Sequence, residues 1–355
     1  MAAWALARVT LARSVFAALT DGAEHSGESL AQAAGVTRSA VWKAIEQLRE
    51  LGLDIEAHTH RGYRLRSSTV LLDAAELRRS LSAEIRAVLN VLEVVWESES
   101  TNAQLLAVPA PPVGQFDVLI AENQTQGRGR RGRSWQSTLG GSLCLSIATT
   151  YEPLPRDLPA LTLAIGVCVK NAVEAAGGKG LALKWPNDLV LASDLSKLGG
   201  ILVELRAEAG GPAQVVIGIG LNISLSAAAR KRVVVSGNTP ADLAECGVLA
   251  SQRHRLAALV ITECVLGLER FGREGFAPFL EAWRAADALR DRQIELSDAS
   301  GNRRGAARGI DRQGALQVEF ENGARVAVLA GDLTVRSDPR VADRGNARGR
   351  SRESG

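Results

Sequence analysis

Residues 127–135 read GRGRRGRSW and pack four arginines and three glycines into the seven residues 127–133. DVLIAEN (117–123) precedes this segment and SLCLSIATT (142–150) follows it, and both patterns are typical of strands. Glycine lets backbone N–H groups approach an anion closely, and arginine supplies charge-assisted, often bidentate hydrogen bonds. The segment therefore predicts an ordered loop inside a folded domain that holds a phosphate or a carboxylate.

The surroundings of this loop exclude two common phosphate-binding motifs. No G-K-[ST] follows, so it is not a Walker A loop. It connects two predicted strands instead of opening a helix, so it is not a dinucleotide fingerprint. A disordered RNA-binding Arg-Gly repeat or a basic address signal is disfavoured, because the repeat is single and internal to a packed domain.

Length and composition indicate a multidomain globular protein. The 355 residues suit two or three domains. The net charge is only +3, so an anion site must come from a local cluster of charge. No apolar run reaches the roughly 18 residues of a membrane span, and we expect no membrane contact. Four scattered cysteines without a CxxC pair indicate reduced thiols and a cytoplasmic location; they are Cys144, Cys168, Cys246 and Cys264.

The first 66 residues predict a winged helix-turn-helix. A helical pattern ends near Leu19, and GESLAQAAG (27–35) predicts a short second helix. Thr37 is placed to cap a third helix over Arg38–Leu51. A two-stranded hairpin follows, and this order of elements is that of a winged helix-turn-helix. The first twenty residues superficially suggest a targeting peptide, but they also serve as the first helix.

Basic residues in this unit favour DNA binding over the alternative of a small helical packing domain. Helices of this kind place the residues at their start against base edges and phosphates, and a hairpin wing contacts the backbone. The candidate DNA-binding residues are Arg38, Ser39, Lys43 and Arg61. His58 and His60 share a strand face, but no third or fourth zinc ligand lies nearby in the sequence.

The rest of the chain divides into four segments. Residues 67–95 read as a linker that leads into the next domain, and 96–286 mix strands and helices as a mixed α/β domain does. Residues 287–336 hold short strands at turn spacing, typical of a small β-barrel. Residues 337–355 are polar and rich in Arg and Gly, and we expect them to be disordered. The fold class is therefore multidomain α+β.

Other polar groups of the middle domain also indicate a site. Thr101 and Gln104 match a capping box, which alone would account for them. Yet Ser100, Thr101 and Asn102 also present neutral polar groups that could orient an uncharged polar ligand such as a ureido ring. Further candidates interrupt or end apolar strands, where an unpaired polar group is costly; they are Lys184, Asn187 and Asp188 around Pro186 in ALKWPNDLVL, Lys197 before GGILVEL, and Asn222 in GIGLN.

Taken together and in this order, STN, GRGRRGRSW, KWPND, KLGGILVEL and GIGLN resemble the biotin–protein ligases. The resemblance extends to about Arg336 and points to the bifunctional bacterial type that also represses the biotin operon. It implies a catalytic domain of the biotin/lipoate-ligase type over 96–286 and an SH3-like barrel over 287–336. It further implies that biotin and ATP give biotinoyl-5′-AMP, and that the adenylate acylates a lysine of the biotin carboxyl carrier protein of acetyl-CoA carboxylase.

The resemblance also implies roles for the motif residues. The biotin head group would be held by Ser100, Thr101, Asn102 and Gln124. The carboxyl group and the phosphate of the intermediate would lie against Arg128, Gly129, Arg130 and Lys197. Nucleotide contacts would come from Trp135, Asn187 and Asn222, with core packing as an equal interpretation of Trp135. The catalytic set would be Arg128, Arg130, Lys184, Asp188 and Lys197, and Mg²⁺ would arrive with ATP near Asp188. The adenylate-bound protein would bind operator DNA as a homodimer.

Three alternatives remain at this point. The chain could be a ligase that does not repress. It could be a non-catalytic metabolite-sensing regulator, although such a protein should have at least one degraded site motif and none is degraded here. A lipoate–protein ligase would share the catalytic fold, but GRGRRGRSW together with KWPND favours biotin.

Overall fold

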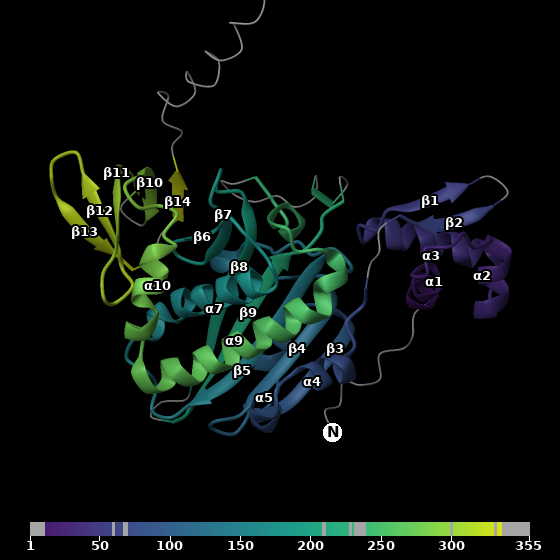
Figure 1. Ribbon diagram of the computed structural model, residues 1–355, viewed down its shortest axis with the longest axis horizontal. Helices are drawn as coiled ribbons and strands as arrows, with labels where there is room; N and C mark the ends of the chain where they lie inside the picture. The colour runs from purple at the N-terminus through teal and green to yellow at the C-terminus, as the bar shows by residue number, and fades with distance from the viewer. Residues whose placement is uncertain are drawn as a thin grey trace, which may run out of the picture.

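The computed structural model describes residues 11–58, 61–66, 70–207, 211–226, 229–230, 239–298, 301–329 and 332–335. His60 and the predicted disordered tail, 337–355, lie outside these residues. The described strands form a two-stranded, a seven-stranded and a five-stranded sheet. Figure 1 shows the small helical unit of the N-terminus on one side of the large sheet and the five-stranded sheet on the other.

The N-terminal unit is a three-helix cluster followed by a hairpin. Its elements are α1 (Leu11–Leu19), α2 (Gly27–Ala34), α3 (Arg38–Glu50), β1 (Ile55–His58) and β2 (Gly62–Leu65). Thr37 caps α3 as predicted, because its side chain accepts a hydrogen bond from the backbone N–H of Ala40 at 3.3 Å. Gly35 ends α2 with φ at 65°, a backbone conformation that favours glycine. The helix-turn-helix order therefore follows from local signals in the chain.

The central sheet has the strand order β3-β4-β5-β9-β8-β7-β6, and only the β3–β4 pair is parallel. Its strands are β3 (Leu89–Ser98), β4 (Phe116–Gln124), β5 (Ser142–Tyr151), β6 (Leu181–Lys184), β7 (Asp188–Leu191), β8 (Lys197–Ala207) and β9 (Ala213–Asn222). Almost every residue of β4 and β5 is buried, which requires layers on both faces.

One predicted strand is wrong. ALKWPNDLVL is not continuous, because residues 185–187 form a turn and β6 pairs back on β7 with Lys184 opposite Asp188. Pro186 follows a cis peptide bond and has no N–H to donate to a ladder. A hairpin therefore replaces the expected strand and places the KWPND motif at its tip.

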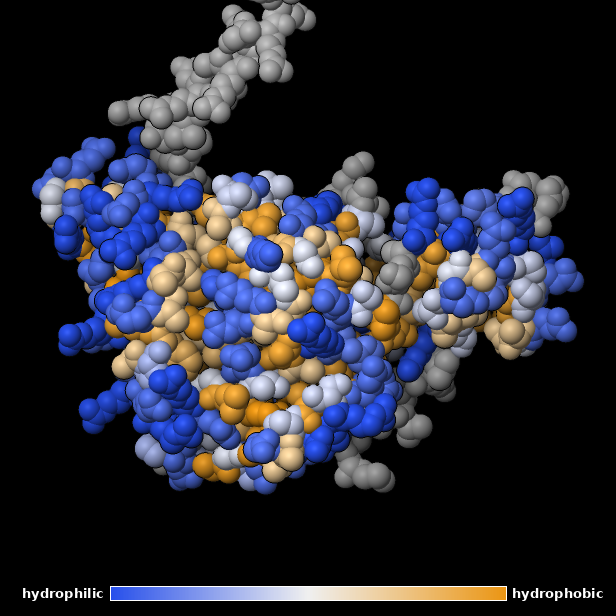
Figure 2. Space-filling view, viewed as in Figure 1, coloured by the Kyte–Doolittle hydropathy of each residue, from blue (hydrophilic) through white to orange (hydrophobic). Residues whose placement is uncertain are grey.

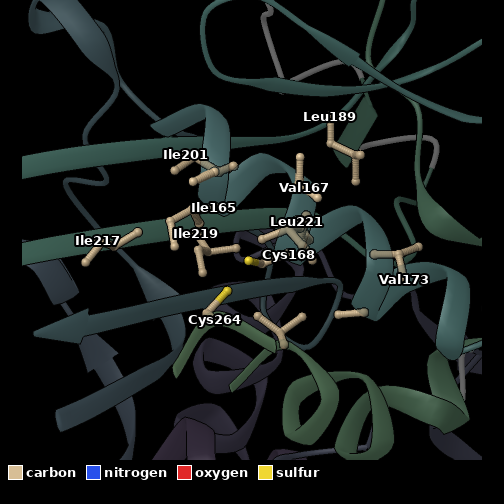
Figure 3. Packing of buried hydrophobic residues seen from close by; sticks show 14 of the residues in the cluster. Ile165, Val167, Cys168, Val173, Leu189, Ile201, Ile217, Ile219, Leu221 and Cys264 are labelled. Atoms are coloured by element: carbon tan, nitrogen blue, oxygen red, sulfur yellow. The ribbon is translucent and has the colours of Figure 1, made fainter. Parts of the chain in front are cut away.

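Helices pack against both faces of this sheet. One face carries α7 (Leu161–Ala175) and α9 (Arg253–Glu274), and Figure 3 shows Ile165 and Val167 of α7 among Ile217, Ile219 and Leu221 of β9. The other face carries α6 (Thr101–Leu106), whose Leu105 is buried with residues of β4, β5 and β9. The remaining helices are α4 (Ala74–Ser80), α5 (Ala83–Val88) and α10 (Leu280–Ala285). Short 3-10 turns occur at Arg130–Gly132, Leu158–Ala160, Leu243–Cys246, Ala250–Gln252 and Ala277–Phe279.

The expectation that no apolar run reaches the length of a membrane span has one exception in the described residues. Leu158–Ala175 is long and apolar enough by length and composition, and 61% of it is buried inside the protein. It contains α7, which packs against α9 and the central sheet. A core helix that is hydrophobic all round meets the same compositional test.

The C-terminal strands form an antiparallel sheet in the order β13-β12-β11-β10-β14. They are β10 (Gln293–Asp298), β11 (Gly301–Ile310), β12 (Leu316–Phe320), β13 (Arg325–Val328) and β14 (Asp332–Val335). β13 and β14 are edges in the described residues, so this sheet is open where a closed barrel was predicted. Its buried face joins the central core through residues such as Leu296 and Val318. On the face drawn in Figure 2, hydrophilic residues gather over this sheet and over the N-terminal unit.

Two residues of the central domain, Trp96 and Leu139, pack into the N-terminal unit. Trp96 of β3 and Leu139 of the β4–β5 connection both belong to the hydrophobic core formed by α1 to α3. The rings of Phe16 and Trp96 lie 5.8 Å apart, and Leu139 donates its backbone N–H to the carbonyl of Leu51 at 3.2 Å. The connection that carries the Arg-Gly loop is therefore tied to the end of α3.

A buried ion pair holds the segment that leaves the N-terminal unit. Arg253 is fully buried and pairs with Glu122 at 2.5 Å. Arg253 also donates to the carbonyls of Ser142 and Val70, both at 2.9 Å, and Glu122 accepts from the N–H of Leu72 at 2.6 Å. Both charges are thus compensated, as burial requires.

Candidate functional site

A cleft of about 510 Å³ opens between α6, the Arg-Gly loop and the strands β7, β8 and β9. Eleven of the thirteen predicted catalytic and ligand-binding residues line it: Ser100, Thr101, Asn102, Gln124, Arg128, Gly129, Arg130, Trp135, Asn187, Asp188 and Lys197. Segments as far apart in the chain as those of Ser100 and Gly220 thus meet at one site. The volume suits a small organic ligand.

The start of α6 forms one end of the cleft, but not by the predicted capping box. Ser100 is the N-cap, and its hydroxyl accepts from the N–H of Ala103 at 3.4 Å. Gln104 instead accepts from the hydroxyl of Ser98 at 2.6 Å. Thr101 is thereby the first helical residue, and its backbone N–H donates to Gln124 at 2.9 Å.

A chain of hydrogen bonds continues from this end along the cleft wall. The hydroxyl of Ser146 lies 2.6 Å from both Thr101 Oγ1 and Asn102 Oδ1. Asn102 Nδ2 donates to Glu204 Oε2 at 2.8 Å, and Arg128 lies 3.5 Å from the other oxygen of Glu204. Ser146 and Glu204 were not predicted from the sequence, although both connect predicted site residues.

The Arg-Gly loop is a tight, internally bonded turn. Gly129 donates to the carbonyl of Arg133 at 2.7 Å, and Trp135 donates to that of Gly127 at 2.8 Å. A side chain at Gly127 would place Cβ 2.5 Å from the Trp135 carbonyl, so only glycine fits there. Arg131 and Gly132 have φ of 53° and 74°, which reverses the chain at the tip. The loop therefore has a defined shape that presents its arginines at the cleft mouth.

Cationic and aromatic groups form the opposite end. Lys197 Nζ lies 2.7 Å from a carboxylate oxygen of Asp188 and 6.0 Å from the centre of the Trp135 ring. The Trp135 ring lies over Gly220, where an added Cβ would come within 2.5 Å of it. Behind the ring, burial raises the pKa of Cys144 to about 11, which makes this thiol a packing group at neutral pH. The cleft thus runs from neutral polar groups to a basic end.

Two predicted residues lie behind the cleft wall. Asn222 is 1% exposed, and its amide donates to the carbonyls of Lys197 and Ala241 at 3.3 and 3.0 Å. Lys184 is buried, and the loss of solvent lowers its pKa, while the nearby Asp188 charge acts in the opposite direction. Asn187 does line the cleft, and its amide also donates to the carbonyl of Ile201 at 3.0 Å.

The predicted DNA-binding residues are all at the surface. Arg38, Ser39 and Lys43 are exposed on α3, and Arg61 is exposed at the turn before β2. Trp42 between them has 54% of its surface exposed. Among the described residues, no three His, Cys, Asp or Glu side chains lie close enough together to hold a metal ion.

Three family models match the chain in the order of these regions. An HTH domain matches residues 14–64, the biotin/lipoate A/B protein ligase family matches 95–222, and the biotin protein ligase C terminal domain matches 291–336.

Known biotin ligases match most of the chain. The bifunctional ligase/repressor BirA of Escherichia coli is 36% identical over 331 residues, which cover 92% of this chain and 98% of that protein. The Bacillus subtilis protein of the same name is 31% identical over 307 residues, which cover 84% and 90%. The structure of the biotin protein ligase from Aquifex aeolicus in complex with biotin and ATP matches with 25% identity and a TM-score of 0.57, over 70% of this chain and all of that one. The chain therefore belongs to the family of bifunctional biotin ligase/repressor proteins.

Proposed function

We propose that this protein is an ATP-dependent biotin–protein ligase that also represses transcription. The observation that carries the ligase proposal is that one cleft is lined both by neutral polar groups and by Arg128, Arg130 and Lys197. Such a cleft suits a ligand with an uncharged polar ring and a carboxylate, as biotin has. The related ligases and the solved complex with biotin and ATP support this assignment.

In the first step, a carboxylate oxygen of biotin attacks the α-phosphorus of ATP. The bond between the α-phosphorus and the bridging oxygen breaks, and pyrophosphate leaves. Both partners are negative, so the attack needs cations placed where the charges meet. We assign this work to Arg128, Arg130 and Lys197, and we assign the orientation of the ring to Ser100, Thr101, Asn102 and Gln124.

In the second step, the amine of the acceptor lysine attacks the carbonyl carbon of biotinoyl-5′-AMP. An amide forms as the amine nitrogen loses a proton to water, the bond between the carbonyl carbon and the phosphate oxygen breaks, and AMP leaves with the electron pair. The intermediate is prone to hydrolysis, so water must be kept out between the steps. The Arg-Gly loop lies at the cleft mouth and is our candidate for the lid. The acceptor is the biotin carboxyl carrier protein.

The nucleotide would lie against Trp135 and Asn187. Asn222 would act indirectly, because it holds the backbone of Lys197. Asp188 is the one carboxylate among the residues that line the described cleft, and Mg²⁺ in nucleotide sites is often bound by one or two carboxylates with substrate phosphates. The residues thus fit an ion that arrives with ATP, with Asp188 as its protein ligand and Lys184 nearby. Such an ion neutralises charge on the triphosphate.

The N-terminal unit would bind operator DNA as part of an adenylate-bound homodimer. α3 would enter the major groove, with Arg38, Ser39 and Lys43 near bases and phosphates. Arg61 would contact the backbone from the β1–β2 hairpin, which we interpret as the wing. We also retain the SH3-like interpretation for the open C-terminal sheet. The four unpaired, buried cysteines agree with a cytoplasmic location.

Intact-mass analysis of a carrier domain tests the ligase. The domain is incubated with this protein, biotin, ATP and Mg²⁺, and one added biotin on the acceptor lysine is expected. No added mass on a competent carrier would refute the ligase and leave a sensor-repressor or a lipoate-type enzyme. A mobility shift of operator DNA tests repression separately, and binding that ignores biotin and ATP would refute the regulated form.

A further inference from the structure

Glu204 has no role in the chemistry above, yet it contacts two residues that line the cleft, Asn102 and Arg128. It lies on β8 with 25% of its side chain exposed. One carboxylate oxygen accepts from Asn102 Nδ2 at 2.8 Å, and the other lies 3.5 Å from Arg128 Nη1. A single acid thus contacts both the head-group end and the Arg-Gly loop.

An acid beside Arg128 opposes the binding of an anion. The Glu204 charge offsets part of the field that Arg128 would otherwise present to a carboxylate or a phosphate. Arg128 has 52% of its side chain exposed, so its ion pair with Glu204 is weak enough to be exchanged for another partner. Arg128 can therefore leave Glu204 when a ligand anion reaches it.

We propose that Glu204 is a positioning residue that holds Arg128 in a resting ion pair and yields it to the carboxylate of the bound ligand. This inference rests on the proposed ligase function. Glu204 restrains the loop in the empty cleft and reduces the affinity for anions that lack the correct head group. The cost is some affinity for the true substrate.

Asn102 links this release to the arrival of the head group. Ser146 donates to Asn102 Oδ1 at 2.6 Å, and Asn102 Nδ2 donates to Glu204. A ligand ring that accepts a hydrogen bond from Asn102 competes with Glu204 for the same amide protons. Binding of the ring therefore weakens the contact between Asn102 and Glu204, which in turn holds Arg128 less firmly. The carboxylate of the same ligand can then pair with Arg128.

The Glu204→Gln variant separates this role from a purely structural one. Its amide oxygen can still accept from Asn102, but the negative charge beside Arg128 is gone. Calorimetry without ATP would compare biotin with biotinamide, which has the same ring system and no carboxylate. We expect biotin to bind about two- to fivefold more tightly to the variant, the worth of a partly exposed ion pair, and biotinamide to gain less, because its ring competes only with a weaker, neutral acceptor for Asn102. In an Arg128→Ala background, Glu204→Gln should change the two affinities by the same factor.

The matched control is Glu281→Gln, which removes a surface ion pair with Arg284 at 2.9 Å on α10 and should leave both affinities unchanged. Equal changes for biotin and biotinamide, or weaker binding of biotin to Glu204→Gln, would overturn the proposal. A wild-type protein that binds neither ligand would instead count against the proposed function.

Discussion

Gly218 of β9 faces Asn102, and Gly218→Ala tests whether the position of Asn102 determines ligand affinity. An alanine Cβ at this site would lie 2.5 Å from Asn102 Oδ1. The oxygen must retreat to the 3.4 Å of ordinary contact, a move of about 0.9 Å. Asn102 is held on both sides, by Ser146 at 2.6 Å and by Glu204 at 2.8 Å, so such a move disrupts at least one of these bonds.

The loss of biotin affinity is the result that tests the assignment. Losing one well-placed hydrogen bond to the ligand costs about 1.4–2.8 kcal/mol when a buried partner is left unsatisfied, or about 10- to 100-fold in the Kd for biotin. The free energy of unfolding should fall by about 1–3 kcal/mol, because the disrupted bond leaves a buried polar group unsatisfied in the folded protein as well, whereas the backbone of Gly218 does not have a positive φ. Calorimetry gives the Kd, and urea denaturation gives the stability.

Gly166→Ala on α7 is the matched control, because the added Cβ would lie 3.4 Å from the Leu183 side chain, an ordinary contact distance. It should leave biotin affinity unchanged. If Gly218→Ala binds biotin within about threefold of the wild type, a difference below ~0.7 kcal/mol, Asn102 does not hold the ligand and the head-group assignment fails.

Three further outcomes are expected. Arg130→Gly should release biotinoyl-5′-AMP and label proteins indiscriminately, and unchanged retention in a filtration assay would contradict the lid. Arg253→Met should cost about 3–5 kcal/mol of unfolding free energy because Glu122 keeps a buried charge, and adding Glu122→Gln should recover most of it in urea denaturation; a single variant as stable as the wild type would refute this. Burial raises the pKa of Asp287 to about 6, so the folded state binds more protons and the unfolding free energy falls as pH rises from about 4 to about 6. Asp287→Asn should remove about 2–3 kcal/mol of that fall, and an unchanged pH profile of urea denaturation would contradict the assignment.

Local chemistry made much of the site predictable. The Arg-Gly loop could be recognised in the sequence because a tight turn that presents positive charge needs glycine and arginine together. Thr37 before α3 is a local signal as well, since a cap concerns residues three positions apart. The family resemblance then linked motifs whose proximity no local pattern contains.

The remainder depends on contacts between distant segments. Glu204 lies near the end of β8, where burial no longer alternates, and in the sequence it looks like any solvent-facing strand residue. Its partners are 102 and 76 positions away, so only the fold reveals its role. The pairing of Arg253 with Glu122 across 131 positions is hidden for the same reason. The KWPND hairpin was misjudged because apolar residues on both sides of a turn imitate one buried strand.

Leu139 belongs to the connection that carries the Arg-Gly loop, yet its side chain is 2% exposed within the core of the N-terminal unit. Ligand binding at the Arg-Gly loop and DNA binding by the N-terminal unit can therefore be treated as two steps of one thermodynamic cycle. Coupling between sites is reciprocal, so the factor by which a ligand changes the affinity for DNA equals the factor by which DNA changes the affinity for that ligand. A titration with an operator fragment, followed only through the affinity for biotin, would therefore measure the coupling free energy of repression.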